Sequence, residues 1–161
     1  MTYRVCFLCS GNICRSPMGE IILRSMLADA GLAGRVEVDS AGTGDWHVGD
    51  GADPRTIAEL KAAGYDGSAH RASQLDAAYL TSRDLILAAD EGHLRRLRSL
   101  ARGLADHAEL RLVREFDPDA VAAGTLELDD PWYGDEEDFR RCRREVEAAC
   151  RGLVDRLRSV V

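Results

Sequence analysis

The sequence has few of the features that mark membrane, secreted or nucleic-acid-binding proteins. No apolar stretch approaches the roughly 18 residues that a membrane span requires. No secretory signal is visible, because residues 1–4 lead directly into an apolar run. Lysine occurs once, and 28 acidic residues against 21 basic ones give a formal net charge of −7. These absences argue against nucleic-acid and membrane partners.

The cysteine count also excludes one class of protein. Five cysteines are an odd number, which argues against a disulfide framework and favours a reducing compartment. We therefore expect a cytoplasmic protein, with export without a signal peptide left open. Cys6, Cys9 and Cys14 lack a second C-x2-C or a histidine at finger spacing, so a zinc site is not expected. No metal or cofactor is predicted.

The 161 residues are enough for one domain with a substantial core, and no repeat or linker divides them. We expect residues 1–161 to form a single domain. Apolar runs alternate with segments of helical pattern, which predicts an α/β fold of three layers, with a four-stranded parallel sheet flanked by helices on both faces. The predicted strands are 4–8, 36–40, 84–88 and 110–113, and the predicted helices are 17–30, 54–63, 91–100 and 136–157.

The most informative stretch follows the first predicted strand. Cys9 ends the apolar run, and Arg15 follows after five intervening residues. Ser16 and Pro17 then favour the start of a helix, with Ser16 as the N-cap and Pro17 in the first position. In open parallel sheets ligands bind beyond the carboxyl ends of the strands, where Cys9 falls.

The loop Ser10–Cys14 is short enough for its amides to turn inward as a nest for an anion. We expect Gly11 and Asn12 to supply the left-handed backbone for this turn. The helix N-terminus and the Arg15 guanidinium would attract a phosphate dianion. The same positive field favours the thiolate form of Cys9, which is the nucleophilic form. The sequence therefore predicts a loop that binds phosphate and attacks its phosphorus.

The segment CFLCSGNICRSPMGE, residues 6–20, closely resembles the phosphate loop of the low-molecular-weight protein tyrosine phosphatases. The likeness extends over nearly the whole chain and suits a bacterial, actinobacterial-like member. Further segments that resemble the family follow in its order, namely 39–42, 45–49, 53–55, 70–74 and 130–134.

The resemblance implies hydrolysis of phosphotyrosine in two steps through a cysteinyl-phosphate. Cys9 would be the nucleophile, Arg15 the phosphate clamp, and Asp130 the general acid and then the base. A leaving phenoxide needs a proton, which a carboxylic acid can supply. Spacing alone would make Asp129-Asp130-Pro131 an acidic turn, and the resemblance assigns the role to Asp130. The implied partners are phosphotyrosine-containing proteins, with inorganic phosphate as product and inhibitor.

Aromatic residues near such a loop can enclose a phenyl ring and so select phosphotyrosine over the shorter phosphoserine. Position 132 carries Trp where most members of the family carry Tyr, which keeps the aromatic surface but removes a hydroxyl. The predicted substrate-binding residues are Ser10, Gly11, Asn12, Ile13, Cys14, Trp46, His47, Trp132 and Tyr133.

The resemblance also implies a supporting hydrogen-bond network of Asn12, Ser16, Ser40 and His70, with Ser16 donating to the leaving thiolate. For Cys14 two interpretations stay open. It is either an oxidant-sensitive partner of Cys9 or a small packing residue. Cys6, Cys142 and Cys150 are expected in the core.

Three other functions compete with this interpretation. A thiol-dependent arsenate reductase uses the same loop but needs a further cysteine, and residues 81–110 contain none. A protein-arginine phosphatase tends to carry Thr at the position of Ile13. A module that only senses anions has no use for Cys9, Arg15 and Asp130 together.

Overall fold

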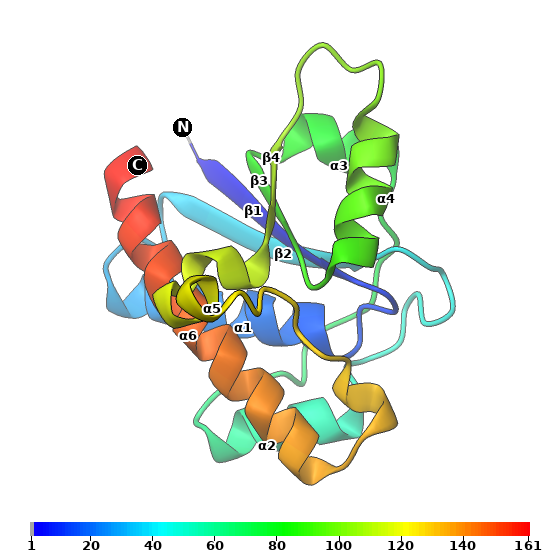
Figure 1. Ribbon diagram of the computed structural model, residues 1–161. Coiled ribbons are helices and arrows are strands. Elements are labelled where there is room, and N and C mark those ends of the chain that lie inside the picture. The colour runs from blue at the N-terminus through cyan, green and yellow to red at the C-terminus, as the bar shows by residue number, and fades with distance from the viewer. Residues whose placement is uncertain (1) are drawn as a thin grey trace.

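The computed structural model describes residues 2–161 and contains, in that range, a four-stranded parallel sheet (Figure 1). Its strand order is β2-β1-β3-β4, so the first strand in the chain lies inside the sheet. Helices cover both faces of the sheet, which confirms the predicted α/β class. The strands are β1 Tyr3–Cys9, β2 Val36–Gly42, β3 Leu85–Ala88 and β4 Glu109–Leu112.

Helices α1 and α6 lie together on one face, whereas α3 and α4 lie on the other (Figure 1). Among residues 2–161, none of the helices is long and apolar enough to cross a bilayer. The helices are α1 Arg15–Asp29, α2 Pro54–Ala62, α3 Ala77–Ser82, α4 Glu91–Ala101, α5 Pro118–Ala123 and α6 Glu136–Val160, with short 3-10 helices η1 Val113–Phe116 and η2 Pro131–Tyr133.

The two-residue period of β1 distributes its side chains between two cores. Val5 and Phe7 pack in the cluster that includes α1 and α6 residues. Cys6 and Leu8 face the opposite way, into the cluster that includes α4 residues. A strand buried on both faces reads as a continuous apolar run, which is why this strand was easy to predict. The expectation that Cys6 is buried is confirmed.

Differences from the predicted elements lie at boundaries and in short helices. The helices α3 and α5 have six residues each, so they present no long periodic pattern in the sequence. The fourth strand was predicted to include Val113, but Val113 begins the 3-10 helix η1. The last helix continues past its predicted end to Val160.

One local device starts three of these helices. Asp53, Asp117 and Asp130 each precede a proline, and each is an N-cap. In every case the carboxylate accepts the backbone N–H two residues later, at 2.8, 3.0 and 3.1 Å respectively. The proline has no N–H that needs a partner, so Asp-Pro is a compact helix start. The predicted acid loop therefore has a defined backbone geometry.

Helix α6 approaches η1 so closely that Gly152 has no room for a side chain. A Cβ atom at Gly152 would lie 1.8 Å from the carbonyl oxygen of Phe116. Gly152→Ala should therefore lower the free energy of unfolding by about 2 kcal/mol, because backbone overlap outweighs the better helix propensity of alanine. Urea unfolding measures this change.

The matched control for this substitution is Gly34→Ala. A Cβ atom at Gly34 meets nothing within 4 Å, so stability should stay near that of the unmodified protein. Equal stability of both variants would contradict the packing argument.

Candidate active site

A cavity of about 340 Å³ opens beyond the carboxyl end of β1. It brings together residues from the loop after β1, the loop after β2 and the segment around η2. Most of the predicted site residues line this cavity. They are Cys9, Ser10, Gly11, Ile13, Cys14, Arg15, Trp46, His47, Asp130, Trp132 and Tyr133.

A larger depression of about 730 Å³ lies beside β2, and its charges are already neutralised. Its three arginines are each paired with a carboxylate. We therefore take the cavity beyond the carboxyl end of β1 as the functional site.

The loop after β1 is held by its carbonyl oxygens. Each of five loop carbonyls accepts a hydrogen bond from a donor outside the ring. Because a trans peptide places the next N–H on the opposite side, these bonds turn the amides inward. The bound carbonyls and their donors are Cys9 with Thr43 N, Ser10 with Gly44 N, Asn12 with His70 Nε2, Ile13 with Asp53 N and Cys14 with Met18 N.

The loop makes its left-handed turn at Asn12, whose φ is 60°. The expectation that Gly11 shares this conformation is wrong, because the described positive-φ glycines do not include it. Position 11 is restricted by a neighbour instead. A Cβ atom there would lie 3.0 Å from Cδ2 of His47, so the imidazole lies against the loop backbone and would have to shift for a larger residue.

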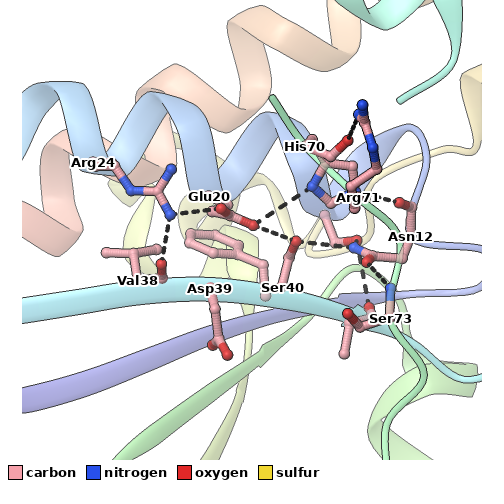
Figure 2. A network of polar contacts seen from close by, with 12 residues as sticks. Asn12, Glu20, Arg24, Val38, Asp39, Ser40, His70, Arg71 and Ser73 are labelled. Atoms are coloured by element: carbon pink, nitrogen blue, oxygen red, sulfur yellow. Dashed lines mark hydrogen bonds and ion pairs between the residues drawn. The ribbon is translucent and has the colours of Figure 1, made fainter. Parts of the chain in front are cut away.

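Asn12, predicted to bind substrate, is buried and is not among the residues that line the cavity. Its side chain lies in a polar network with Ser40 and Ser73 (Figure 2). Its Oδ1 accepts the N–H of Ser73 at 2.9 Å, which fixes the orientation of the amide. Its Nδ2 then donates to Oγ of Ser16 at 2.7 Å and to Oγ of Ser40 at 2.9 Å. The Ser16 oxygen accepts this bond and lies 2.9 Å from Cys9 Sγ and 3.4 Å from the carbonyl oxygen of Ala41. Its proton is therefore available to a Cys9 thiolate, which can only accept.

The network continues to Glu20, a residue that the sequence analysis missed. Oε1 of Glu20 accepts the Ser40 hydroxyl at 2.6 Å, and Oε2 pairs with Arg24 at 2.6 Å (Figure 2). His70, predicted as a supporting residue, donates from Nε2 to the Asn12 carbonyl at 2.7 Å. Its Nδ1 lies 3.8 Å from Glu20. The carboxylate at position 20, one turn after Ser16 on a largely buried helix, was the sequence signal for this contact.

The predicted helix start at Ser16 and Pro17 is two residues too late. Helix α1 begins at Arg15, with Cys14 in the N-cap position. The hydroxyl of Ser16 does not cap the helix because it is engaged by Asn12 and Cys9. Pro17 fits the first turn, since N–H groups there have no partner within the helix. No side chain caps this end of the helix, so its first amides have no partner within the helix.

Arg15 is 4% exposed and is held at one end of its guanidinium. Its Nη1 donates to Asp90 Oδ2 at 2.9 Å and to the carbonyl of Leu128 at 2.8 Å, while Nη2 lies 3.7 Å from Asp130 Oδ2. Burial opposes the positive charge, but Cys9, Asp130 and Asp90 outweigh it and raise the pKa of Arg15. The edge formed by Nε and Nη2 is left for an anion.

Asp90 was also missed by the sequence analysis. It lies just beyond the end of β3, the strand next to β1, and it is the N-cap of α4. Burial acts to raise the pKa of Asp90, but His93 and Arg15 more than compensate and lower it. Its position at the carboxyl edge of the sheet was the one available signal.

Asp130 has two functions available to its two oxygens. Oδ1 caps η2 through the N–H of Trp132, whereas Oδ2 faces Arg15 across the cavity. Asp130 can therefore cap the turn with one oxygen while the other faces the cavity. Arg55 donates to the Trp132 carbonyl at 3.3 Å and so connects this segment to α2.

The aromatic residues form a rim around the cavity. Trp46 is 70% exposed and Tyr133 is 83% exposed, which is unusual for large apolar side chains. Trp132 meets Tyr133 edge to face, with ring centroids 5.0 Å apart. Such a rim can receive a flat apolar group whose charged end reaches the loop.

All five cysteines, which lie within the described residues, are free and buried. Burial, followed by the charge of Asp53, raises the pKa of Cys14 to about 12. Cys14 is therefore a thiol at neutral pH, and its role as an oxidant-sensitive partner of Cys9 stays a prediction. Cys142 and Cys150 lie in the core as expected, and burial raises the pKa of each.

An oxyanion bound in this ring of amides would meet a thiol at the floor and a carboxyl group at the side. That arrangement is the one a cysteine-dependent phosphatase on an α/β sheet requires.

The particular family follows from comparison with known proteins. The model of the low molecular weight phosphotyrosine protein phosphatase family matches residues 4–161. The chain belongs to this family and is an enzyme of the protein-tyrosine-phosphatase class.

Individual relatives match this chain over nearly their whole length. A low molecular weight protein-tyrosine-phosphatase of the actinobacterium Streptomyces coelicolor is 53% identical, covering 100% of this chain and 97% of the relative. The crystal structure of an Entamoeba histolytica protein tyrosine phosphatase has a TM-score of 0.90 at 28% identity, covering 98% of each chain. A Drosophila arginine phosphatase has a TM-score of 0.87 at 26% identity, covering 95% of this chain and 96% of that one.

The contacts of Asn12 predict how two substitutions will differ. Asn12→Gly and Asn12→Ala both remove three hydrogen bonds, and Asn12→Gly should lower the free energy of unfolding by about 3 kcal/mol. Asn12→Ala should lower it by about 4 kcal/mol, because the φ at this position is 60°. Urea unfolding of the two variants measures both effects. Equal stability of the two would show that the backbone conformation carries no cost.

Proposed function

We propose that this enzyme hydrolyses phosphotyrosine in proteins through a cysteinyl-phosphate intermediate. The observation that carries the proposal is the hydroxyl of Ser16 beside Cys9 Sγ, at 2.9 Å, within a ring of inward-facing amides. The hydroxyl and the amides stabilise a thiolate when the cavity is empty and a phosphoryl group when it is filled.

In the first step the Cys9 thiolate attacks phosphorus, a sulfur–phosphorus bond forms, and the bond to the tyrosine oxygen breaks. Arg15 and the loop amides hold the equatorial oxygens. The leaving phenoxide takes a proton from Oδ2 of Asp130.

In the second step Asp130 accepts a proton from water, which attacks the phosphorus. The sulfur–phosphorus bond breaks, inorganic phosphate is released and Cys9 leaves as a thiolate that the Ser16 hydroxyl stabilises. The proton balance closes, since Asp130 regains in this step the proton that it gave in the first.

The rim explains why the substrate would be phosphotyrosine. The phenyl ring would lie among Trp46, Trp132 and Tyr133 while the phosphoryl group reaches the loop. Ile13 also lines the cavity, and its alkyl side chain offers no hydrogen bond to the guanidinium of a phosphoarginine. The larger indole at position 132 keeps this apolar contact without the usual hydroxyl.

The partners in this proposal are phosphotyrosine-containing proteins, with inorganic phosphate as product and inhibitor. The nucleophile must stay a reduced thiol, so we place the reaction in the cytoplasm. We assign the whole function to residues 1–161 as one domain.

A substrate panel tests the proposal. The purified protein should release phosphate from phosphotyrosine peptides faster than from phosphoserine or phosphoarginine peptides, and it should not reduce arsenate. Cys9→Ser should abolish turnover while inorganic phosphate still binds, because the amides and Arg15 remain. Faster turnover of phosphoarginine would overturn the substrate assignment, and residual turnover in Cys9→Ser would overturn the nucleophile.

The role of Asp130 predicts a dependence on the leaving group. Asp130→Asn keeps the cap of η2, since asparagine is an equally good N-cap, but it has no proton to give. Its kcat should fall by about 100-fold or more for phenyl phosphates with poor leaving groups, and by less for those with good ones. The measurement is kcat across a series of aryl phosphates.

The matched control is Asp129→Asn, because Asp129 is an exposed neighbour that pairs with Arg141. This variant should keep its kcat for every substrate. A loss of equal size across the series in Asp130→Asn would argue against a general acid.

A further inference from the structure

The loop after β1 makes one contact that neither the nest nor the nucleophile explains. Oγ of Ser10 lies 2.9 Å from Nε2 of His93. Ser10 lines the cavity, whereas His93 belongs to α4 and is 5% exposed. Among residues 2–161, His93 is the one hydrogen-bond partner of the Ser10 hydroxyl.

The direction of this hydrogen bond follows from the other side of the imidazole. The backbone N–H of Asp90 donates to Nδ1 of His93 at 3.3 Å, as part of the capping box of α4. A backbone amide can only donate, so Nδ1 is the acceptor. Burial lowers the pKa of His93 to about 4, so the ring is neutral at physiological pH and has one proton. That proton is on Nε2.

The tautomer of His93 determines where the Ser10 hydroxyl can donate its proton. Since Nε2 of His93 donates, the Ser10 oxygen accepts, and the hydroxyl keeps its own proton to give elsewhere. Within the described residues no protein acceptor takes this proton. An anion bound in the cavity beside Ser10 would be the acceptor that remains.

We propose that the Ser10 hydroxyl donates a hydrogen bond to the bound phosphoryl group, and that His93 is the positioning residue that directs it there. This inference rests on the phosphatase function proposed above. It adds a side-chain donor to a site otherwise made of loop amides and Arg15. Asp90 serves both parts, because it holds Arg15 through Oδ2 and fixes His93 through its N–H.

The other neutral tautomer of His93 would have its proton on Nδ1. Nδ1 of His93 lies 3.1 Å from Oδ1 of Asp90. If Nδ1 held the proton, it would face this carboxylate, and Ser10 would donate to Nε2 and have nothing to give the anion. The geometry favours the first form, because Nδ1 is the one acceptor of the Asp90 N–H among residues 2–161, whereas Oδ1 accepts the His93 N–H in either form.

The first experiment determines the tautomer in the intact protein. A long-range 1H–15N spectrum of histidine-labelled protein at neutral pH should show His93 with a protonated Nε2 and a bare Nδ1. His93→Gln identifies the signals by their loss. A protonated Nδ1, or a doubly protonated ring, would overturn the inference without requiring any variant to fold.

The second experiment measures binding of inorganic phosphate by calorimetry, so it does not depend on turnover. Ser10→Ala should weaken binding by roughly tenfold to a hundredfold, the range for a hydrogen bond to a charged group. His93→Asn should weaken it similarly, because its amide reaches the Asp90 N–H but not Ser10. His93→Gln should restore much of the affinity, since its amide nitrogen can occupy the place of Nε2.

The double variant Ser10→Ala/His93→Asn should bind no more weakly than Ser10→Ala alone, because His93 acts through Ser10. Ser99→Ala and His107→Gln are matched controls on and beside α4, and both should bind phosphate normally. Equal losses of phosphate affinity in His93→Gln and His93→Asn would show that His93 only packs against the loop and does not position Ser10. Unchanged phosphate affinity in Ser10→Ala would overturn the inference.

These outcomes separate the inference from the proposed function. Protein that binds phosphate as described but does not hydrolyse phosphotyrosine would contradict only the function. An active phosphatase whose phosphate affinity is unchanged by Ser10→Ala would contradict only the inference.

Discussion

The hydrogen bond from the Ser73 amide to Asn12 is the contact on which the rest of the site depends. It determines which end of the Asn12 side chain faces the two serines. Ser16 then has a proton available to a Cys9 thiolate or to the Ala41 carbonyl, and Ser40 has one for Glu20. A single backbone donor from the segment before α3 thereby orients the amide that donates to both serine hydroxyls. The left-handed turn at Asn12 puts the side chain where these bonds can form.

The second constraint is the burial of Arg15. A guanidinium removed from water is costly unless hydrogen bonds and opposite charges compensate it. Asp90 and the Leu128 carbonyl satisfy one end of the group, and Asp130 lies near the other. The partners hold the arginine in place while its free edge faces the cavity. The same arrangement stabilises the empty fold and prepares the site for a dianion.

Much of the fold was predictable because its long elements carry strong patterns. The buried run of β1 and the amphipathic α6 are examples. The two six-residue helices were missed, since fewer than two turns give no period to read. The expectation for Gly11 was wrong because its role depends on His47, a residue from the loop after β2 that no local rule brings to it. Ser16 was misjudged as a cap because its hydroxyl has stronger partners in the folded chain.

The sequence by itself determined the chemistry of the loop, because thiol, amides and guanidinium lie within seven consecutive residues whose geometry is local. Only the tertiary structure decided what surrounds them. Asp90 and His93 reach the loop because β3 lies beside β1 in the sheet, although they follow it by 75 residues or more. Asp-Pro starts three helices, but only at Asp130 does the chain place the second carboxylate oxygen opposite Arg15. Strand order and helix packing, which no local pattern encodes, place Asp130 opposite Arg15.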